Sequence, residues 1–392
     1  MATPMVRAKT QAEEEETVDI VLTTPLSFQW ESNLDHEAPN LLQRILSLFK
    51  NVSPGSDITR FQLPPLFNIP KSHLQCYGES VYSTSSDLLS KCAAGESPLE
   101  RMTCVVAWSI STTRPLSFGL APYNPILGET HHVSRGTLNV LLEQVSHHPP
   151  VSALHATDET NNIELVWCQC PVPRFHGTTI ETEVQGKRRL YLAGRGESYV
   201  MNSPNLSIKL FPVPSVEWVG KVGIKCPESG LEAEICYKGS SFLSLGGGKK
   251  TVTGKIFDSS LSKTLYEIDG RWDRTISLKD VSNGKVKILY YAKETLSRLR
   301  TPILLDQQGV RQSESARVWA KVSRGILSKD WDRAREAKTV VEERERKLLR
   351  QRNSIGVTWK PQHFKISYSK QDGWDCSPIE KNVPPSPMIY SV

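Results

Sequence analysis

The chain has 392 residues, of which 38% are hydrophobic and 23% are charged, with 24 Gly and 25 Pro, which excludes a coiled coil, a collagen and a wholly disordered chain. The formal charge of +6 is too small to predict a nucleic-acid partner, and none is expected, but it favours an anionic partner. Because there is no apolar run of about 20 residues and no signal peptide, we expect a cytosolic protein with reduced cysteines.

Two N-terminal segments differ in character. Residues 1–24 are rich in glutamate and predict a disordered acidic arm. Residues 39–50 predict a helix, since Pro39 suits its first turn. The helix would carry an apolar stripe that includes Leu42, Ile45, Leu46 and Phe49. Taken alone, this stripe fits a surface helix docked on a core better than a mobile element that covers a lipid or touches a membrane.

Residues 98–292 consist of short runs rich in Val, Ile, Leu, Thr, Tyr and Trp at a spacing of about ten residues. Turn residues separate the runs, and Asn283-Gly284 is a strong hairpin signal. Because no helical pattern interrupts these runs, they favour a large antiparallel sheet closed as a barrel. Length alone predicts two or three domains, but one large sheet of this kind can account for the whole length. We therefore predict a single domain over residues 25–380.

The C-terminal part changes to a helical pattern. Residues 314–352 predict helices, of which the last is long and polar and begins at Asp330. Residues 293–352 contain 16 Lys or Arg against 9 Asp or Glu, so the excess positive charge of the chain lies in this segment. Residues 381–392 are rich in proline and predict a frayed tail.

The octapeptide EQVSHHPP at residues 143–150 contains the main candidate for a binding site. Adjacent side chains on a strand face opposite sides, so His147 and His148 can share a ligand only at a strand end, and the two prolines end strand pairing there. Two imidazoles beside a phosphate would each donate a hydrogen bond in the charged form. A metal is not expected, because no third ligand has a suitable spacing. Hydrolysis through Ser146 is not expected either, because there is no G-x-S-x-G motif.

Two further segments carry polar side chains suited to an anion. Asn124 lies in a rigid turn at residues 121–130, and its amide can donate and accept hydrogen bonds. Lys338, Glu342 and Arg346 are spaced i, i+4, i+8 on one face of the long helix. Taken alone, these three side chains form surface ion pairs worth a few tenths of a kcal/mol each. The alternative is that the two cations clamp an anion while the glutamate orients one of them.

EQVSHHPP resembles the signature of the oxysterol-binding-protein-related family of lipid-transfer proteins. ERMTCVVAW at 100–108, NPILGET at 124–130 and W-x-P-x-x-F at 359–364 occur in the family order, so the resemblance covers about residues 25–380. APYNPILGETHH is most similar to the short plant-type members, which consist of the lipid-binding domain. The resemblance implies a mainly β fold, a large incomplete antiparallel β-barrel around an apolar lipid tunnel with an N-terminal helical lid and a C-terminal helical region.

The resemblance also implies a function. Members bind a sterol or another membrane lipid in the tunnel, and many exchange it between membranes against phosphatidylinositol 4-phosphate, so we expect no enzymatic activity and no cofactor. It further implies transient contact with membranes such as the endoplasmic reticulum or Golgi and an endoplasmic-reticulum adaptor, although the chain has no convincing double-Phe acidic tract. The alternatives are a lipid sensor that signals through a protein partner without net transfer, and a lipid hydrolase or phosphatase.

The resemblance assigns roles to individual residues. It implies that the phosphoinositide headgroup is held by six side chains, His147, His148, Asn124, Lys338, Glu342 and Arg346. It implies that residues 39–50 form the lid, closing the tunnel with Leu42, Ile45, Leu46 and Phe49, which replaces the surface-helix interpretation. One position departs from the family, because Ala121 stands where members usually carry a lysine that meets the phosphate. We therefore expect weaker headgroup binding or a substitute cation from Arg114 or Arg135.

Overall fold

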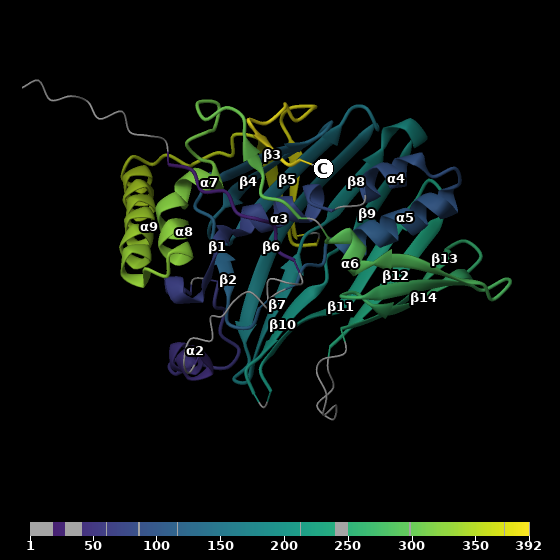
Figure 1. Ribbon diagram of the computed structural model, residues 1–392, viewed down its shortest axis with the longest axis horizontal. Helices are drawn as coiled ribbons and strands as arrows, with labels where there is room; N and C mark the ends of the chain where they lie inside the picture. The colour runs from purple at the N-terminus through teal and green to yellow at the C-terminus, as the bar shows by residue number, and fades with distance from the viewer. Residues whose placement is uncertain are drawn as a thin grey trace, which may run out of the picture.

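The computed structural model describes residues 19–27, 41–59, 61–84, 87–115, 117–211, 213–239, 250–297, 299–371 and 373–391. These residues form a large sheet with helices along it (Figure 1). The helices are α2 (Leu41–Phe49), α3 (His73–Tyr82), α4 (Leu88–Ala94), α5 (Pro98–Ser111), α6 (Ala292–Thr295), α7 (Ser315–Val318), α8 (Ala320–Leu327) and α9 (Trp331–Ser354), with 3₁₀ turns η1 (Pro65–Phe67) and η2 (Ala193–Arg195). None of these helices is long and apolar enough to cross a membrane.

The strands, in chain order, are β1 (Asn68–Ser72), β2 (Ala121–Tyr123), β3 (Thr130–Arg135), β4 (Leu138–Ser146), β5 (Val151–Asp158), β6 (Ile163–Phe175), β7 (Thr179–Gln185), β8 (Arg188–Leu192), β9 (Glu197–Met201), β10 (Asn205–Lys209), β11 (Ser215–Cys226), β12 (Leu231–Lys238), β13 (Thr251–Asp258), β14 (Lys263–Arg271), β15 (Thr275–Asp280), β16 (Val286–Tyr291), β17 (Ile303–Leu304), β18 (Phe364–Ser369), β19 (Gly373–Pro378) and β20 (Met388–Ile389).

Sixteen of these strands belong to one sheet, which runs from β16 through β11, β6 and β4 to β17. Its pairings are antiparallel except for the parallel pair of β20 with β3. β8 and β9 bridge β6 to β11 beside the β7–β10 pair. Among the described strands, the end strands β16 and β17 do not pair with each other, so the barrel is incomplete. The predicted mainly β fold with a large incomplete antiparallel barrel is confirmed.

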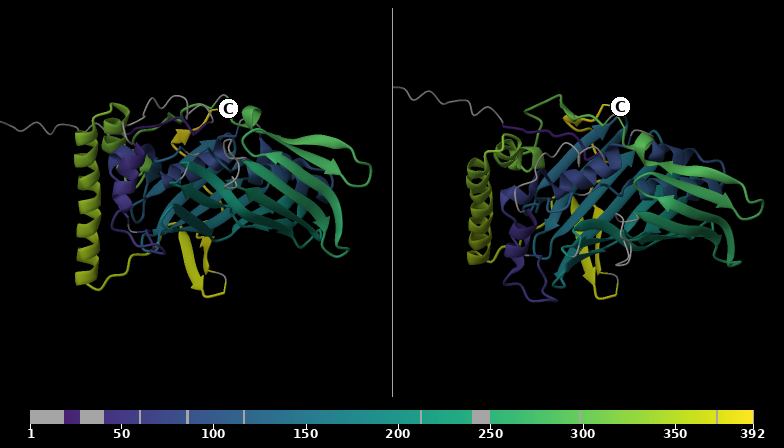
Figure 2. Two further views of the ribbon diagram at one scale, coloured as in Figure 1. Left: turned by 90° about the horizontal axis from the view of Figure 1, so that it is seen from below. Right: turned by 60° about the horizontal axis from the view of Figure 1, so that its bottom comes forward.

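The two faces of the sheet have different neighbours because side chains alternate along each strand. On β4, Val140 and Leu142 join a large core together with α3, α4 and α5. Val145 faces the other way and packs with Phe364 and Cys376 of the β18–β19 hairpin. Figure 2 shows this hairpin, in yellow, on the side of the sheet away from those helices. We call the face under α3, α4 and α5 the inner face.

The expectation of strands alone over residues 98–292 is wrong at its start, because residues 98–111 form α5. Ser97 caps this helix by accepting from the backbone N–H of Glu100, and Pro98 occupies its first turn. Almost every residue from Arg101 to Ser111 is buried. A helix buried on all sides has no polar stripe, so the 3.6-residue period that would have identified it is missing.

Both predicted disordered ends are wrong where the structure describes them. Residues 1–18 and 392 lie outside the described residues. Within residues 19–24, Asp19 forms an ion pair with Arg324, and Thr23 accepts a hydrogen bond from the buried Lys71 ammonium. In residues 381–391, β20 adds to the sheet beside β3 and β17, and Met388 and Tyr390 are buried. The proline-rich composition concealed these contacts, which involve partners distant in the sequence.

Candidate functional site

The histidine pair lies at the end of β4, beside the 121–130 turn. The Nδ1 atom of His147 donates to the backbone carbonyl of Pro125 at 2.9 Å. The rings of His147 and His148 lie 4.5 Å apart between centroids, at 51°. Asn124, next to Pro125, is exposed, as is His148. The contact therefore brings the three predicted residues of the two motifs together at the end of β4.

The state of His147 suits an anion that arrives from solution. Burial lowers the pKa of His147, and the neighbouring His148 lowers it further, against the effect of the bond to Pro125. Since a carbonyl only accepts, Nδ1 carries the proton and Nε2 has no partner among the described residues. A phosphate at Nε2 would favour the charged ring, which could then donate from both nitrogens.

Lys338 reaches the same turn from α9. It is 9% exposed, and its ammonium donates to the side-chain oxygen of Asn68 at 2.8 Å and to the carbonyl of Leu63. Asn68 in turn donates to the carbonyl of Ala121 at 3.1 Å. Burial lowers the pKa of Lys338, and Glu342 opposes that shift. Two of the three ammonium donors have protein partners, so the third remains for an anion.

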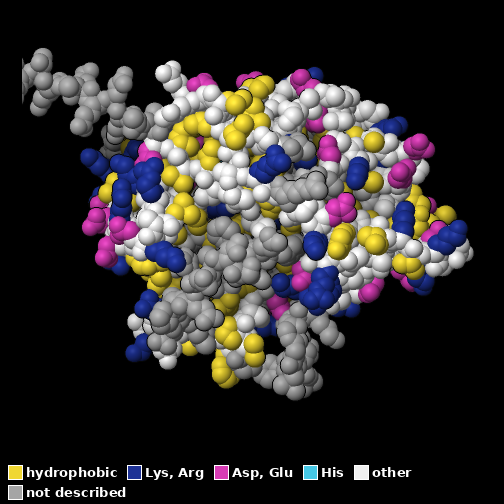
Figure 3. All heavy atoms as spheres, in the orientation of Figure 1, with side chains coloured by type: hydrophobic (Ala, Val, Ile, Leu, Met, Phe, Trp, Pro, Cys, Tyr) yellow, Lys and Arg dark blue, Asp and Glu magenta, His cyan; other side chains and the backbone are white. Residues whose placement is uncertain are grey.

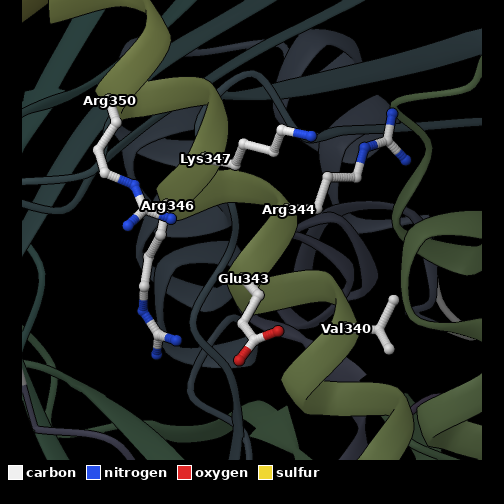
Figure 4. A pocket seen from close by; sticks show the side chains of 6 residues that line it. All are labelled: Val340, Glu343, Arg344, Arg346, Lys347 and Arg350. Carbon is white, nitrogen blue, oxygen red and sulfur yellow. The ribbon is translucent and has the colours of Figure 1, made fainter.

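Glu342 and Arg346 lie on the next two turns of α9. Arg346 donates to Glu342 at 3.2 Å and to the side chain of Gln62 at 3.3 Å. Figure 3 shows Lys and Arg side chains gathered, with some acidic ones, over the edge of the molecule formed by α8 and α9. Arg346 also lines a hollow of about 590 Å³ along α9 with Val340, Glu343, Arg344, Lys347 and Arg350 (Figure 4). We call this surface the basic face of α9.

The structure thus connects four of the predicted residues, His147, His148, Asn124 and Lys338, through the 121–125 backbone. We call these four, with Glu342 and Arg346, the outer site. Among the described residues, no hydrogen bond joins Glu342 or Arg346 to the histidines. The headgroup role of all six residues stays a prediction. The described residues contain no group of three or more His, Cys, Asp or Glu that could hold a metal ion.

Asn68 is a site residue that the sequence did not reveal. It links Lys338 to the turn although the two residues are 270 positions apart, and no spacing or motif marks it. Gln62 plays a similar part for Arg346. Only the packing of η1 and β1 against the C-terminal helices identifies these two amides.

Glu129, in the NPILGET motif, has a structural task. Its carboxylate accepts hydrogen bonds from the backbone of Ile126 at 2.9 Å, the hydroxyl of Ser315 at 2.7 Å and the indole of Trp319 at 2.8 Å. It is fully buried, and burial raises its pKa. Glu129 therefore joins the turn to α7 and α8 and fixes the position of the outer site.

Two other motifs meet in the same way. The carboxylate of Glu143 accepts from the backbone N–H groups of Gln362 and His363, both at 2.8 Å. Gly128 has a φ of +79°, and a Cβ there would lie 3.0 Å from the ring of Trp359. The W-x-P-x-x-F segment therefore holds the turn and the end of β4 from outside, and a side chain at position 128 would be both strained and crowded.

The four side chains predicted to close the tunnel do not all lie on one buried face of α2. Ile45 and Phe49 of α2 are buried, and Phe49 stacks on Phe175 of β6 at 5.1 Å between centroids. Leu46 is 44% exposed and faces away from this contact, because it is one position from Ile45 on the helix. The side chain of Leu42 and residues 39–40 lie outside the described residues. Tunnel closure by α2 stays a prediction for Ile45 and Phe49, and Leu46 does not share their buried face.

The predicted substitutes for the missing lysine at position 121 do not lie there. Arg114 is buried in the core, where its guanidinium donates to the carbonyl of Glu79 at 2.9 Å. Arg135 pairs with Leu138 at the end of β3 that is remote from the turn. Neither arginine therefore replaces the lysine.

Comparisons with known proteins agree with this architecture. A family model described as oxysterol-binding protein matches residues 44–324. The chain is 50% identical to oxysterol-binding protein-related protein 4B of Arabidopsis thaliana over 97% of this chain and 100% of that one. It superimposes on the Osh1 ORD domain in complex with cholesterol with a TM-score of 0.75, at 22% identity over 92% of this chain and 90% of that chain. The Osh3 ORD in complex with PI(4)P from Saccharomyces cerevisiae gives 0.65, at 21% identity over 94% of each chain.

Proposed function

The chain belongs to the oxysterol-binding protein family, and from this premise we propose that it is a cytosolic lipid-transfer protein. It takes a sterol or another membrane lipid into a tunnel inside the barrel and exchanges it between membranes against phosphatidylinositol 4-phosphate. It does so without chemical change to either lipid, so it is not an enzyme. Proteins of the same fold have been solved with cholesterol and with PI(4)P.

One observation carries the headgroup part of this proposal. The bond from His147 to Pro125 and the chain of bonds from Lys338 through Asn68 to Ala121 join cationic or protonatable donors to one turn, in which Asn124 is exposed. Each of these two donors keeps a hydrogen-bonding position without a partner among the described residues. A phosphate monoester has several acceptor oxygens and about two negative charges, so it matches this set.

The surface around this site suits transient contact with a membrane. The basic face of α9, which includes Arg346, would be attracted to anionic lipids. An apolar helix such as α2 can open at a bilayer and cover the lipid in water. We expect the contact to be peripheral, at membranes such as the endoplasmic reticulum or Golgi.

The test is extraction of phosphatidylinositol 4-phosphate from vesicles by the full chain carrying His147→Ala and His148→Ala. We expect extraction to be abolished while the melting temperature and sterol uptake stay near those of the unsubstituted protein. The matched control is His176→Ala, because His176 is an exposed surface histidine whose nearest carboxylate oxygen, on Glu181, is 3.9 Å away. Unchanged extraction by the double variant would refute the headgroup assignment.

Two further measurements separate the alternatives. Transfer between two vesicle populations distinguishes a transfer protein from a sensor that binds lipid without moving it. Mass spectrometry of the recovered lipid distinguishes transfer from hydrolysis, since an altered headgroup or acyl chain would contradict the proposal.

A further inference from the structure

The inner face of the barrel contains a group of buried polar side chains with unused hydrogen-bonding atoms. We call it the inner cluster, and it consists of Trp108, Arg114, Trp167, Arg188 and Tyr290. Their exposed fractions lie between 0% and 6%. Both indole N–H groups, the Nε atoms of both arginines, Nη1 of Arg114 and the Tyr290 hydroxyl have no partner among the described residues. Buried polar groups are normally hydrogen-bonded, so this concentration requires an explanation.

Arg188 is the centre of one half of the cluster. It lies on β8, and its guanidinium carbon is 5.7 Å from the ring centroid of Trp108 on α5 and 5.9 Å from that of Trp167 on β6. Its terminal nitrogens donate to the hydroxyls of Ser109 at 3.2 Å and Thr112 at 2.9 Å. These contacts fix the guanidinium plane between helix and sheet, so its unpartnered Nε–H has a defined position.

Arg114 is the centre of the other half. It follows the C-terminal end of α5, and one terminal nitrogen donates to the carbonyl of Glu79 at 2.9 Å and to Ser83 at 3.3 Å. The remaining two nitrogens are unpartnered. Burial lowers the pKa of Arg114, and Tyr290, whose hydroxyl is also unpartnered, opposes that shift most strongly.

Tyr237 on β12 connects the two halves. Its hydroxyl is 3.0 Å from the hydroxyl of Thr113, the residue before Arg114. It is also close enough to Arg188 to raise that pKa against the effect of burial, and close enough to Tyr290 to raise the pKa of that phenol. Tyr237 therefore lies beside residues of both halves of the cluster.

The charge of the inner cluster is not balanced by protein. Among the described residues, no carboxylate forms an ion pair with Arg114 or Arg188. The carboxylate of Glu79, which raises the pKa of Arg114, is paired with the Lys71 ammonium at 2.5 Å. Arginine keeps its proton, and a buried cation without an anion is strongly unfavourable. The missing partner must be an acceptor, because indole and guanidinium groups only donate.

We infer that the inner cluster binds the anionic group of a lipid, a carboxylate, sulfate or phosphate, that enters the barrel. This rests on the proposed function, since it requires that the barrel takes up a lipid. A neutral sterol hydroxyl accepts about two hydrogen bonds and neutralises neither guanidinium, whereas an acidic group offers two or more oxygens and a charge. The preferred occupant of the interior is therefore an acidic lipid.

The inner cluster is distinct from the outer site. Trp167 lies on the inner face of β6, where it pairs with Leu154 of β5. Leu154 pairs in turn with Leu142 of β4, which is four residues before the end of β4 at Ser146. In Figures 1 and 2, α5, β8 and β12 lie at the side of the molecule away from α9. An anion held by Arg114 and Arg188 is thus a different group from a headgroup held at His147 and Lys338.

The test uses the full chain and phosphatidylcholine vesicles that contain matched lipid pairs. One arm compares cholesterol sulfate with cholesterol, and the other compares oleate with oleyl alcohol. The first arm tests a sterol skeleton and the second a straight hydrocarbon chain. Protein is separated by flotation and its lipid is measured by mass spectrometry. We expect the anionic member of at least one pair to be bound at least about tenfold more tightly, which corresponds to one charge-assisted hydrogen bond.

Four variants locate the preference. Arg188→Met should abolish it. Tyr290→Phe removes only the unpartnered hydroxyl, so it should keep the fold and reduce the preference about threefold. If the arginine variant does not fold, this variant tests the inference in its place. The control Tyr191→Phe alters an exposed tyrosine on β8, the strand that carries Arg188, and should change nothing. His147→Ala with His148→Ala should leave the preference intact.

The outcomes separate the two proposals. Equal uptake of both members of each pair would overturn the acidic-lipid inference and leave lipid transfer standing. A preference that survives Arg188→Met in folded protein would also overturn it. If the arginine variant does not fold, a preference that Tyr290→Phe leaves undiminished would overturn it instead. Uptake of none of the four lipids would count against the proposed function itself, and with it against this inference.

Discussion

The outer site and the inner cluster both place cations near the same sheet, but they treat buried polar groups in opposite ways. Beside the outer site, the carboxylate of Glu129 is fully buried and accepts three hydrogen bonds. In the inner cluster, the guanidinium of Arg114 is also buried, but it keeps two nitrogens without a partner among the described residues. The first arrangement holds a loop in place for a ligand that arrives from outside, whereas the second requires the ligand itself to complete it.

The largest expected effect comes from removing Glu129, the carboxylate that accepts three hydrogen bonds beside the outer site. Glu129→Ala should destabilise the fold by about 3–5 kcal/mol, because three buried donors lose a charged acceptor. Denaturant unfolding measures this, and headgroup extraction should fail with it because the 124–128 turn loses its anchor. The control is Glu336→Ala, an exposed glutamate on α9, for which we expect a change below about 0.5 kcal/mol. A fully stable Glu129 variant would show that the network does not hold the site.

The same contrast explains what the sequence could predict. The β-barrel followed from short runs with turn signals, and the residues of the outer site followed from the resemblance carried by EQVSHHPP and its companion motifs. Asn68 could not be found, because it contacts Lys338 across 270 positions. The inner cluster could not be found either, since Arg114 and Arg188 look like ordinary loop and strand arginines until their burial is known. Helix α5 was missed for the related reason that burial on all sides removes its periodicity.

An intermediate effect is expected from restoring the lysine that the family usually carries. Ala121→Lys places a cation beside the bond from Asn68 to Ala121, close to the Lys338 ammonium. We expect affinity for phosphatidylinositol 4-phosphate to rise about tenfold, because a further charge-assisted hydrogen bond reaches the phosphate. Ala121→Met, of similar length without charge, is the matched control. Preference for acidic lipids in the interior should not change in either variant, and a change there would mean that the two sites are not independent.

The smallest effect is the pH dependence of the outer site. In the free protein, burial and His148 hold the pKa of His147 below its usual value, and a bound phosphate would raise that pKa. The complex therefore binds this proton more tightly than the free protein does, so headgroup affinity is highest at low pH and falls as the pH rises through the pKa of the complex. We expect affinity about threefold weaker at pH 8 than at pH 6.5.

That pH range separates the histidine from the ligand. Below about pH 6 the phosphate itself takes up a proton and loses charge, which weakens binding and opposes the histidine effect. Between pH 6.5 and 8, the phosphate loses its remaining proton and gains charge, which favours binding, so a fall in affinity over this range in a vesicle-binding titration reports on the protein. His147→Ala with His148→Ala should remove the slope along with most of the affinity. Uptake of cholesterol sulfate should show no such slope, because Arg114 and Arg188 stay charged throughout this range; a shared slope would mean that one titrating group serves both sites.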